Sequence, residues 1–248
     1  MLHAILKGKA RRVNILNEES QSWRSIFRTY EDLLTAALWE RISYLSDDAL
    51  HQFLSSLLEI DVRQWGKFES VIFWPKYDFP AATDESLSFL INGENDYAEP
   101  DVVVNFEHAA LLVEVKPPAG GKQYQKQWCK EIYTWINSED VKPHLHFLAL
   151  GNLPANTTAL FNELNALFND VSYYGLEWQQ FRTKLHYPER AWPSRQDQRI
   201  IDDCLQALAL YDVHDPLRPW PLFLRFLSSQ MLPDDISFLK ENYHDRSL

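Results

Sequence analysis

Two carboxylates and an ammonium group lie at the ends of two short apolar segments, and side chains of these types can hold a divalent metal ion. Asp101 opens the apolar run 101–104, and Glu114 and Lys116 close the run 111–116. Side chains at i and i+2 of a strand share a face, so Glu114 and Lys116 project to the same side. If the two runs pair as an antiparallel hairpin, Asp101 lies near both, and the three groups converge at one end of a buried sheet.

Two interpretations of this grouping remain open at the level of sequence. Charged groups that end a buried strand must be paired, solvated or bound to a metal, because an unpaired buried charge is costly. Lys116 could form an ion pair with Glu114 or Asp101 at the edge of the sheet. Alternatively, the hard oxygen ligands of Asp101 and Glu114 suit Mg²⁺ or Mn²⁺. Such an ion can generate hydroxide and stabilise the charge on a transferring phosphate, with Lys116 positioning the attacking water.

A helix predicted at 29–45 could add a third carboxylate. Thr29 stands three residues before Asp32, which is close to the pattern of a capping box. Leucine and isoleucine side chains at positions 34, 38, 42 and 45 form one apolar stripe at 100° per residue, and Glu31 falls on that stripe. A carboxylate at the head of a core-facing stripe either interacts with the helix dipole in water or faces a buried site.

The remaining pattern predicts helices and strands around a mixed sheet, in an α/β or α+β arrangement. A polar loop or hairpin is expected at 83–98, and 172–185 mixes strand and turn character. Beyond the segments already described, helices are predicted at 47–58, 122–137, 154–168 and 199–210, and strands at 68–79 and 144–150.

The helix predicted at 122–137 carries a basic stripe. Lys122, Lys126 and Lys130 repeat at i, i+4 and i+8, starting six residues after Lys116. The stripe could follow a nucleic-acid backbone toward the metal, or it could be a solvated helix face.

The acidic motif resembles a known nuclease signature. Pro100 and Asp101, followed after twelve residues by Glu114, Val115 and Lys116, resemble the motif of the PD-(D/E)xK nuclease superfamily, which has the restriction-endonuclease-like fold. The resemblance implies a helix, a three-stranded meander, a helix and a further strand, with the motif on the second and third strands. The expected fold is therefore α/β, with a restriction-endonuclease-like mixed central sheet flanked by helices.

The resemblance also implies roles for the residues of the site. Asp101 and Glu114 would hold Mg²⁺, with Mn²⁺ as an alternative, and the main-chain carbonyl of Val115 would be a further ligand. Lys116 would orient or activate the attacking water. Glu31 matches the glutamate that many members carry on the first helix.

Some members of the superfamily place a catalytic glutamine on the helix that follows the lysine. Gln123 is the preferred match here, with Gln125 and Gln127 as competitors. The family form is a glutamine followed four residues later by tyrosine, whereas here Gln127 stands four residues after Gln123.

Residues 25–225 resemble stand-alone nucleases of bacterial genome defence, most clearly in the segments EDLLTAALWERISYL, EVKPPAGGKQYQKQW and LEWQQF. The resemblance implies a metal-dependent endonuclease that hydrolyses phosphodiester bonds of DNA, in defence against foreign DNA. The alternative is a catalytically inert subunit of the same fold that binds DNA or a protein within a larger complex. A plain protein-interaction module, with a structural ion pair at Lys116, is a second rival.

The charge of the chain is unevenly distributed. The chain has 24 Lys and Arg against 35 Asp and Glu, a net charge of −11, which excludes a general nucleic-acid coat protein. Residues 1–30 carry six basic and two acidic side chains, and 182–199 is also basic. We expect DNA contacts on 122–130 and these two stretches; otherwise a partner subunit or a homodimer must deliver the DNA.

The domain prediction is a basic segment at 1–28 and one domain at 29–248, with an aromatic, proline-rich C-terminal extension.

Other whole-chain signals predict a cytoplasmic protein with no membrane segment. Two cysteines far apart exclude a disulfide framework, and no apolar run has the length of a signal peptide or a bilayer span. His144 and His146 share a strand face without an evident third metal ligand, and His108 is expected to be exposed.

Overall fold

The computed structural model describes residues 30–80, 97–186 and 192–214, together with positions 5, 10, 22, 23 and 26. The chain divides into two compact units, Met1–Val213 and His214–Leu248. His214 is the described residue of the second unit, so the predicted C-terminal extension lies outside the described residues. Nearly all of the predicted basic segment 1–28 lies outside them too, so the predicted domain boundaries stay predictions.

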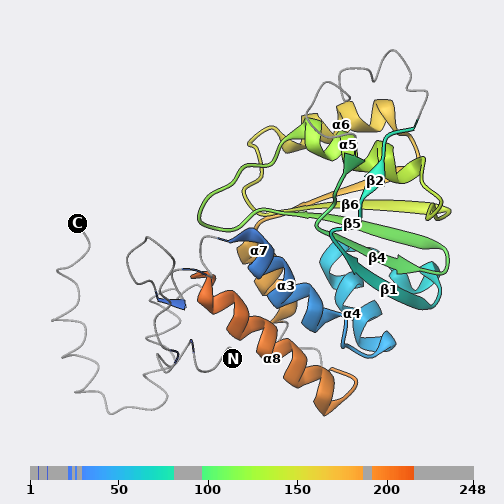
Figure 1. The fold of residues 1–248 in the computed structure, drawn as a ribbon. Helices are drawn as coiled ribbons and strands as arrows, with labels where there is room; N and C mark the ends of the chain where they lie inside the picture. Colours follow the sequence, from blue (N-terminus) through green and yellow to red (C-terminus); the bar gives the residue numbers. More distant parts are fainter. Residues whose placement is uncertain are drawn as a thin grey trace, which may run out of the picture. The chain divides into compact units, whose positions relative to one another are not determined.

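A five-stranded mixed sheet forms the centre of the first unit (Figure 1). Its first three strands form an antiparallel meander, and the last two run parallel to the third. The order across the sheet is β1 (Phe68–Phe73), β4 (Val102–Phe106), β5 (Ala109–Val115), β6 (His144–Leu150) and β7 (Val171–Leu176). A separate two-stranded sheet pairs β2 (Tyr77–Asp78) with β3 (Tyr97–Ala98). The predicted α/β fold with a mixed central sheet flanked by helices is therefore confirmed.

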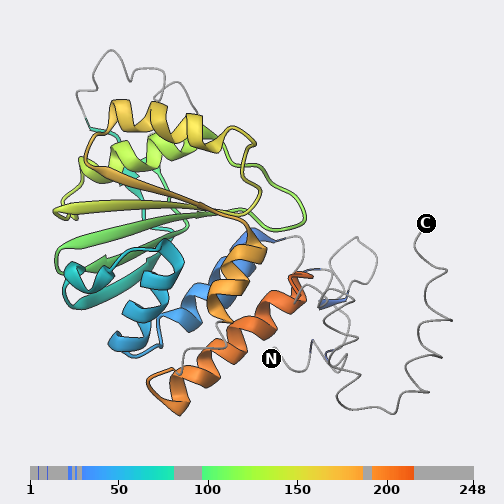
Figure 2. The same cartoon turned by 180° about the vertical axis from the view of Figure 1, so that it is seen from behind.

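Helices cover both faces of the sheet, as the two opposite views show (Figures 1 and 2). One face is covered by α5 (Gln125–Ile136) and α6 (Thr157–Leu167). The other is covered by α3 (Glu31–Ile42), α4 (Asp47–Leu58), α7 (Trp178–Leu185) and α8 (Arg195–Leu210), and the short 3-10 helix η1 (Val62–Trp65) follows α4.

The two layers explain the composition of β5. Val113 and Val115 enter the core cluster with α3, α4 and α8, whereas Ala110 and Leu112 enter the cluster with α5. Both faces of the strand are buried, so it needs a nearly continuous apolar run. A charged residue within such a strand is therefore exceptional, and Glu114 is the one that β5 contains.

Several predicted elements have different bounds in the structure. The first helix begins at Glu31, and Tyr30 occupies the N-cap without a side-chain capping bond, while Thr29 lies outside the described residues. The strand predicted at 68–79 ends at Phe73, because Trp74 takes a positive φ of 48° before Pro75. The segment 172–185 separates into β7 and α7. The helix predicted from 122 begins at Gln125, so Lys122 precedes it.

Within the described ranges, no helix is both long enough and apolar enough to cross a membrane.

Candidate metal centre

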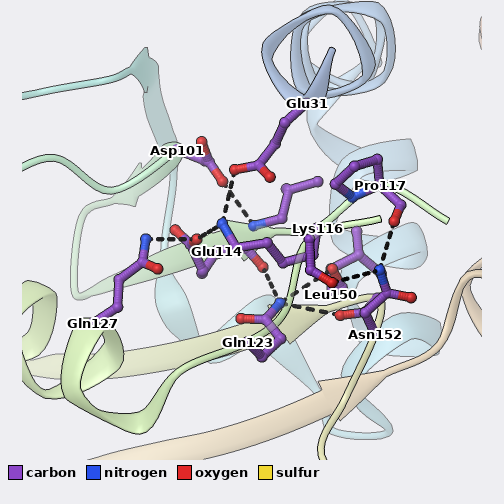
Figure 3. A network of polar contacts seen from close by, with 12 residues as sticks. Glu31, Asp101, Glu114, Lys116, Pro117, Gln123, Gln127, Leu150 and Asn152 are labelled. Carbon is purple, nitrogen blue, oxygen red and sulfur yellow. Dashed lines mark hydrogen bonds and ion pairs between the residues drawn. The ribbon is translucent and has the colours of Figure 1, made fainter. Parts of the chain in front are cut away.

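The β4–β5 hairpin brings Asp101 next to Glu114. The register pairs Val102 with Val113, so the next position outward sets Asp101 opposite Glu114. The main-chain N–H of Val115 donates a hydrogen bond of 2.8 Å to Asp101 Oδ2 and fixes the carboxylate in place (Figure 3). The sequence expectation that these two carboxylates converge is met by the strand pairing itself.

Glu31 reaches the same point from the first turn of α3. One carboxylate oxygen from each of Glu31, Asp101 and Glu114 lies within 4.8 Å of the other two, a grouping that could hold a metal ion. Lys116 Nζ donates to Glu31 Oε1 at 2.8 Å and also to Glu114 Oε1. Lys116 is thus shared between two carboxylates, which differs from the single bridge expected of a purely structural ion pair.

Burial and mutual repulsion disfavour the ionised forms of the buried carboxylates in this site. Asp101, Glu114 and Lys116 are all buried. Burial, followed by the charge of Glu114, raises the pKa of Asp101 to about 8. Burial, followed by the charge of Glu131, raises the pKa of Glu114 well above its usual value. Burial alone would lower the pKa of Lys116, but the carboxylates of Glu114 and Glu31 outweigh it and raise that pKa. A divalent cation would relieve the repulsion among the carboxylates.

Gln123, the expected catalytic glutamine, does not contact the carboxylates. Its Nε2 donates to main-chain carbonyls of Glu114, Leu150 and Gly151 at 3.2–3.3 Å, and its Oε1 accepts from Trp128 Nε1 at 2.7 Å. The buried amide therefore ties the end of β5 to the end of β6.

Gln127, one of the two competitors, is the glutamine that contacts the carboxylates. Its Nε2 donates to Glu114 Oε1 at 2.7 Å (Figure 3). Gln125 points elsewhere and donates to Glu163 Oε2 at 2.7 Å. The difference follows from the later start of α5, because residue 123 lies in extended chain and residue 127 in the first helical turn.

Glu131 extends the acidic cluster and was missed by sequence reasoning. It lies one helical turn after Gln127, is 1% exposed, and neither carboxylate oxygen has a hydrogen-bond partner of normal geometry among the described residues. Burial, followed by the charge of Asp101, raises its pKa to about 8, and Glu114 and Gln127 lie close enough to lower it in part. Glu131 lies on the apolar stripe with Trp128, Ile132 and Trp135, and a carboxylate at such a position indicates a buried site, as it does for Glu31.

The chain after Lys116 is held by the end of β6 and the start of α7. Trp178 Nε1 donates to the carbonyl of Lys116 at 2.7 Å. Asn152 Nδ2 donates to the carbonyls of Pro117, Gly120 and Gly121 at 2.7, 2.6 and 3.3 Å. The resulting loop lies against the site, as a side chain added at Gly121 would come within 3.1 Å of Lys116 Cδ and 3.7 Å of Glu31 Oε2.

The expected lysine stripe is only partly helical. Lys122 is exposed and precedes α5, and Lys126 is exposed on its first turn. Lys130 is partly buried, with its ammonium group 5.8 Å from the centre of the Phe79 ring. Lys122 and Lys126 are therefore the two exposed members of the expected stripe.

No histidine within the described ranges belongs to this cluster. His146 is buried against Trp65, with ring centroids 4.3 Å apart, and its Nδ1 lies 3.2 Å from the hydroxyl of Tyr174. Burial lowers its pKa to about 4, as expected of a core histidine. His108 lies at the opposite end of the hairpin from Glu114 and is exposed, as expected.

Comparisons with known proteins add a relative without a described activity. No protein-family model matches the sequence, and no solved structure matches it. The chain is 23% identical over 236 residues to an uncharacterized protein of Pasteurella multocida (strain Pm70), an alignment that covers 89% of this chain and 83% of the relative. The function of this chain therefore rests on the geometry of its own site.

Proposed function

We propose that the protein is a metal-dependent endonuclease that hydrolyses phosphodiester bonds of DNA, with Mg²⁺ held by Asp101 and Glu114. The observation that carries the proposal is the convergence of three carboxylates on a buried lysine. Glu31 is in α3, Asp101 directly precedes β4 and Glu114 is in β5, and each brings an oxygen within 4.8 Å of the others. The four side chains carry formal charges of three minus and one plus, a deficit that suits a hard divalent cation.

The side chains of the site have different roles in the proposed reaction. A bound divalent ion supplies hydroxide near neutral pH and stabilises the charge that develops on the phosphate. Asp101 and Glu114 hold that ion, and the Val115 carbonyl is a further ligand by resemblance. Lys116, 2.8 Å from Glu31, orients the attacking water and donates to the phosphate oxygens.

Gln127 takes the place first expected for Gln123. It donates to Glu114 Oε1 and so limits the orientations of that carboxylate. A donor of this kind fixes a metal ligand in the geometry that binding requires. Gln123 acts through the backbone of β5 and β6 instead.

The order of elements supports membership of the PD-(D/E)xK superfamily. A helix, an antiparallel meander, a helix and a parallel strand follow one another in the chain, with Asp101 immediately before the second strand of the meander and Glu114 and Lys116 at the end of the third. The role in defence against foreign DNA rests on the sequence resemblance alone.

A nuclease assay tests the proposal. Labelled single- and double-stranded DNA and RNA are incubated with the protein in Mg²⁺, Mn²⁺ or EDTA. We expect metal-dependent cleavage of DNA, and Asp101→Asn should lower the rate by about 100-fold or more while preserving the side-chain volume. Glu107→Gln is the matched control, because Glu107 is an exposed carboxylate at the other end of the same hairpin. Equal rates for parent and Asp101→Asn would exclude this site.

One observation favours the alternative of an inert subunit. Lys116 already pairs with both Glu31 and Glu114, so the apo site is partly neutralised without metal. Calorimetric titration with Mn²⁺ separates the two, since an inert member with a permanent ion pair binds no metal, whereas the nuclease binds it through Asp101.

A further inference from the structure

Two exposed tyrosines occupy equivalent positions on the two helices that carry residues of the candidate site. Tyr30 is the N-cap of α3, directly before Glu31, and Tyr124 is the N-cap of α5, three residues before Gln127. Tyr30 is 53% exposed and Tyr124 60% exposed. Neither side chain makes a capping hydrogen bond, although Ser, Thr, Asp or Asn at this position stabilises a helix by about 1 kcal/mol.

The two tyrosines lie on the segments that form one rim of the site. A Cβ at Gly121 would lie 3.1 Å from Lys116 Cδ and 3.7 Å from Glu31 Oε2, so the chain at Gly121 passes beside the first turn of α3. Tyr124 follows Gly121 by three residues, and Tyr30 precedes Glu31 by one. Three tyrosines are the most exposed large hydrophobic side chains among the described residues, and two of them are at this rim.

The charged and aromatic residues around Tyr124 indicate a ligand that combines negative charges with aromatic rings, as a nucleic acid does. Lys122, Tyr124 and Lys126 are exposed, while Gln123 between them is buried and fixed to the backbone. Along this exposed stretch of chain, a cation, an aromatic ring and a second cation therefore follow one another at every second position. Stacking on aromatic side chains combined with lysine contacts to phosphates is the pattern of single-strand binding, because every unpaired base offers a ring face. A fully paired duplex has its ring faces covered by neighbouring base pairs.

We propose that Tyr30 and Tyr124 stack on unpaired bases on either side of the scissile phosphate, so that the substrate is single-stranded DNA or DNA with unpaired nucleotides at the cleavage point. The inference rests on the proposed nuclease function and narrows it to a class of substrate. Lys122 and Lys126 contact the phosphates that flank the base on Tyr124.

Binding is measured by fluorescence anisotropy with a labelled oligothymidine and a blunt duplex, with Ca²⁺ in place of Mg²⁺ so that cleavage does not interfere. Tyr30→Ala and Tyr124→Ala should each weaken single-strand binding by about tenfold, the loss of one stacking contact. Tyr124→Phe should bind as the parent does, because stacking needs the ring and not the hydroxyl. Duplex binding should be weaker and insensitive to all three changes.

Tyr44→Ala is the matched control. Tyr44 is 60% exposed, like Tyr124, but follows the C-terminal end of α3, about 20 Å from Tyr30 along a helix of this length. An oligonucleotide with consecutive abasic positions should bind the parent and the Tyr→Ala variants equally. Single-strand affinities that do not change in Tyr30→Ala and Tyr124→Ala would overturn the inference, as would equal losses on single strand and duplex. Cleavage by the parent, assayed separately in Mg²⁺, shows whether the nuclease proposal fails instead.

Discussion

Two carboxylates in this protein occupy positions where a helix should be apolar. Glu31 heads the buried stripe of α3, and Glu131 lies on the buried stripe of α5. Both point toward Asp101 and Glu114, and Glu131 is completely enclosed. Placing carboxylates on core-facing stripes costs stability, so they mark the place where the fold serves a site rather than its own packing.

The cost of Glu131 should appear as a pH dependence of stability in metal-free protein. An unfolded glutamate loses its proton near pH 4.5, whereas Glu131 in the fold keeps it to about pH 8. The unfolded state therefore gives up its proton first, and the free energy of unfolding falls as pH rises between these values. Glu131→Gln has no proton to lose at this position. Its free energy of unfolding should therefore rise relative to that of the parent as pH increases across this window, by about 1.4 kcal/mol for each unit by which the pKa of Glu131 is higher in the folded than in the unfolded state.

Urea unfolding in EDTA at pH 5 and pH 8 measures this gain. Glu139→Gln provides the control, because Glu139 is an exposed carboxylate between α5 and β6, and a gain larger than the one this variant shows reports the burial of Glu131. A difference between Glu131→Gln and the parent that stays constant with pH would mean that Glu131 is ionised in the fold.

At the scale of elements, the junction between β6 and α7 holds the loop that follows Lys116. Gly151 has a φ of +83°, and a Cβ there would lie 2.2 Å from Trp178 Nε1 and 2.4 Å from the Lys116 carbonyl. Trp178 and Lys116 are hydrogen-bonded to each other, so neither can move aside without losing that bond. The close approach of three elements at this point requires a residue without a side chain.

Gly151→Ala should therefore lower the free energy of unfolding by roughly 3 kcal/mol or more, from the backbone conformation and the clash together. Gly120→Ala is the matched comparison. Gly120 also has a positive φ, of +110°, but a Cβ there would meet nothing within 4 Å, so its cost should be about 1–2 kcal/mol. Chemical denaturation gives both values, and equal losses would show that the crowding around Gly151 does not decide the result.

Some elements of the site could be predicted from local sequence, and others could not. Alternation and two short apolar runs were enough to predict the hairpin that joins Asp101 to Glu114, because strand pairing fixes which side chains face each other. Gln127, the glutamine that contacts Glu114, was not the preferred candidate because the helix was expected from Lys122. Asn152 binds the carbonyls of Gly120 and Gly121, and Gln123 binds the carbonyl of Leu150 at the end of β6, so residues 117–124 stay out of the helix. These contacts join residues about 30 positions apart, which local periodicity does not record.

At the scale of the whole molecule, the net charge of −11 limits how the proposed DNA substrate can be bound. Residues 1–30 carry a surplus of +4, so the remainder carries −15, and general attraction for phosphates is weak. Near the site, Lys122 and Lys126 are exposed, while Lys130 rests on Phe79. If the protein is the proposed nuclease, its affinity for DNA must come from a few phosphate contacts together with contacts to the bases.

This balance predicts a shallow dependence of DNA binding on salt. Each phosphate contact adds about 0.7 to the slope of log affinity against log salt for a single strand, so two lysines contribute about 1.4. In the double variant Lys122→Gln, Lys126→Gln, the slope should fall by that amount, as measured by anisotropy titrations between about 50 and 200 mM salt. Lys142→Gln should lose none, because Lys142 precedes β6 at the end of the sheet opposite to Glu114. A slope that is unchanged in the double variant would move the phosphate contacts to the basic stretches 1–28 and 182–199 or to a partner subunit.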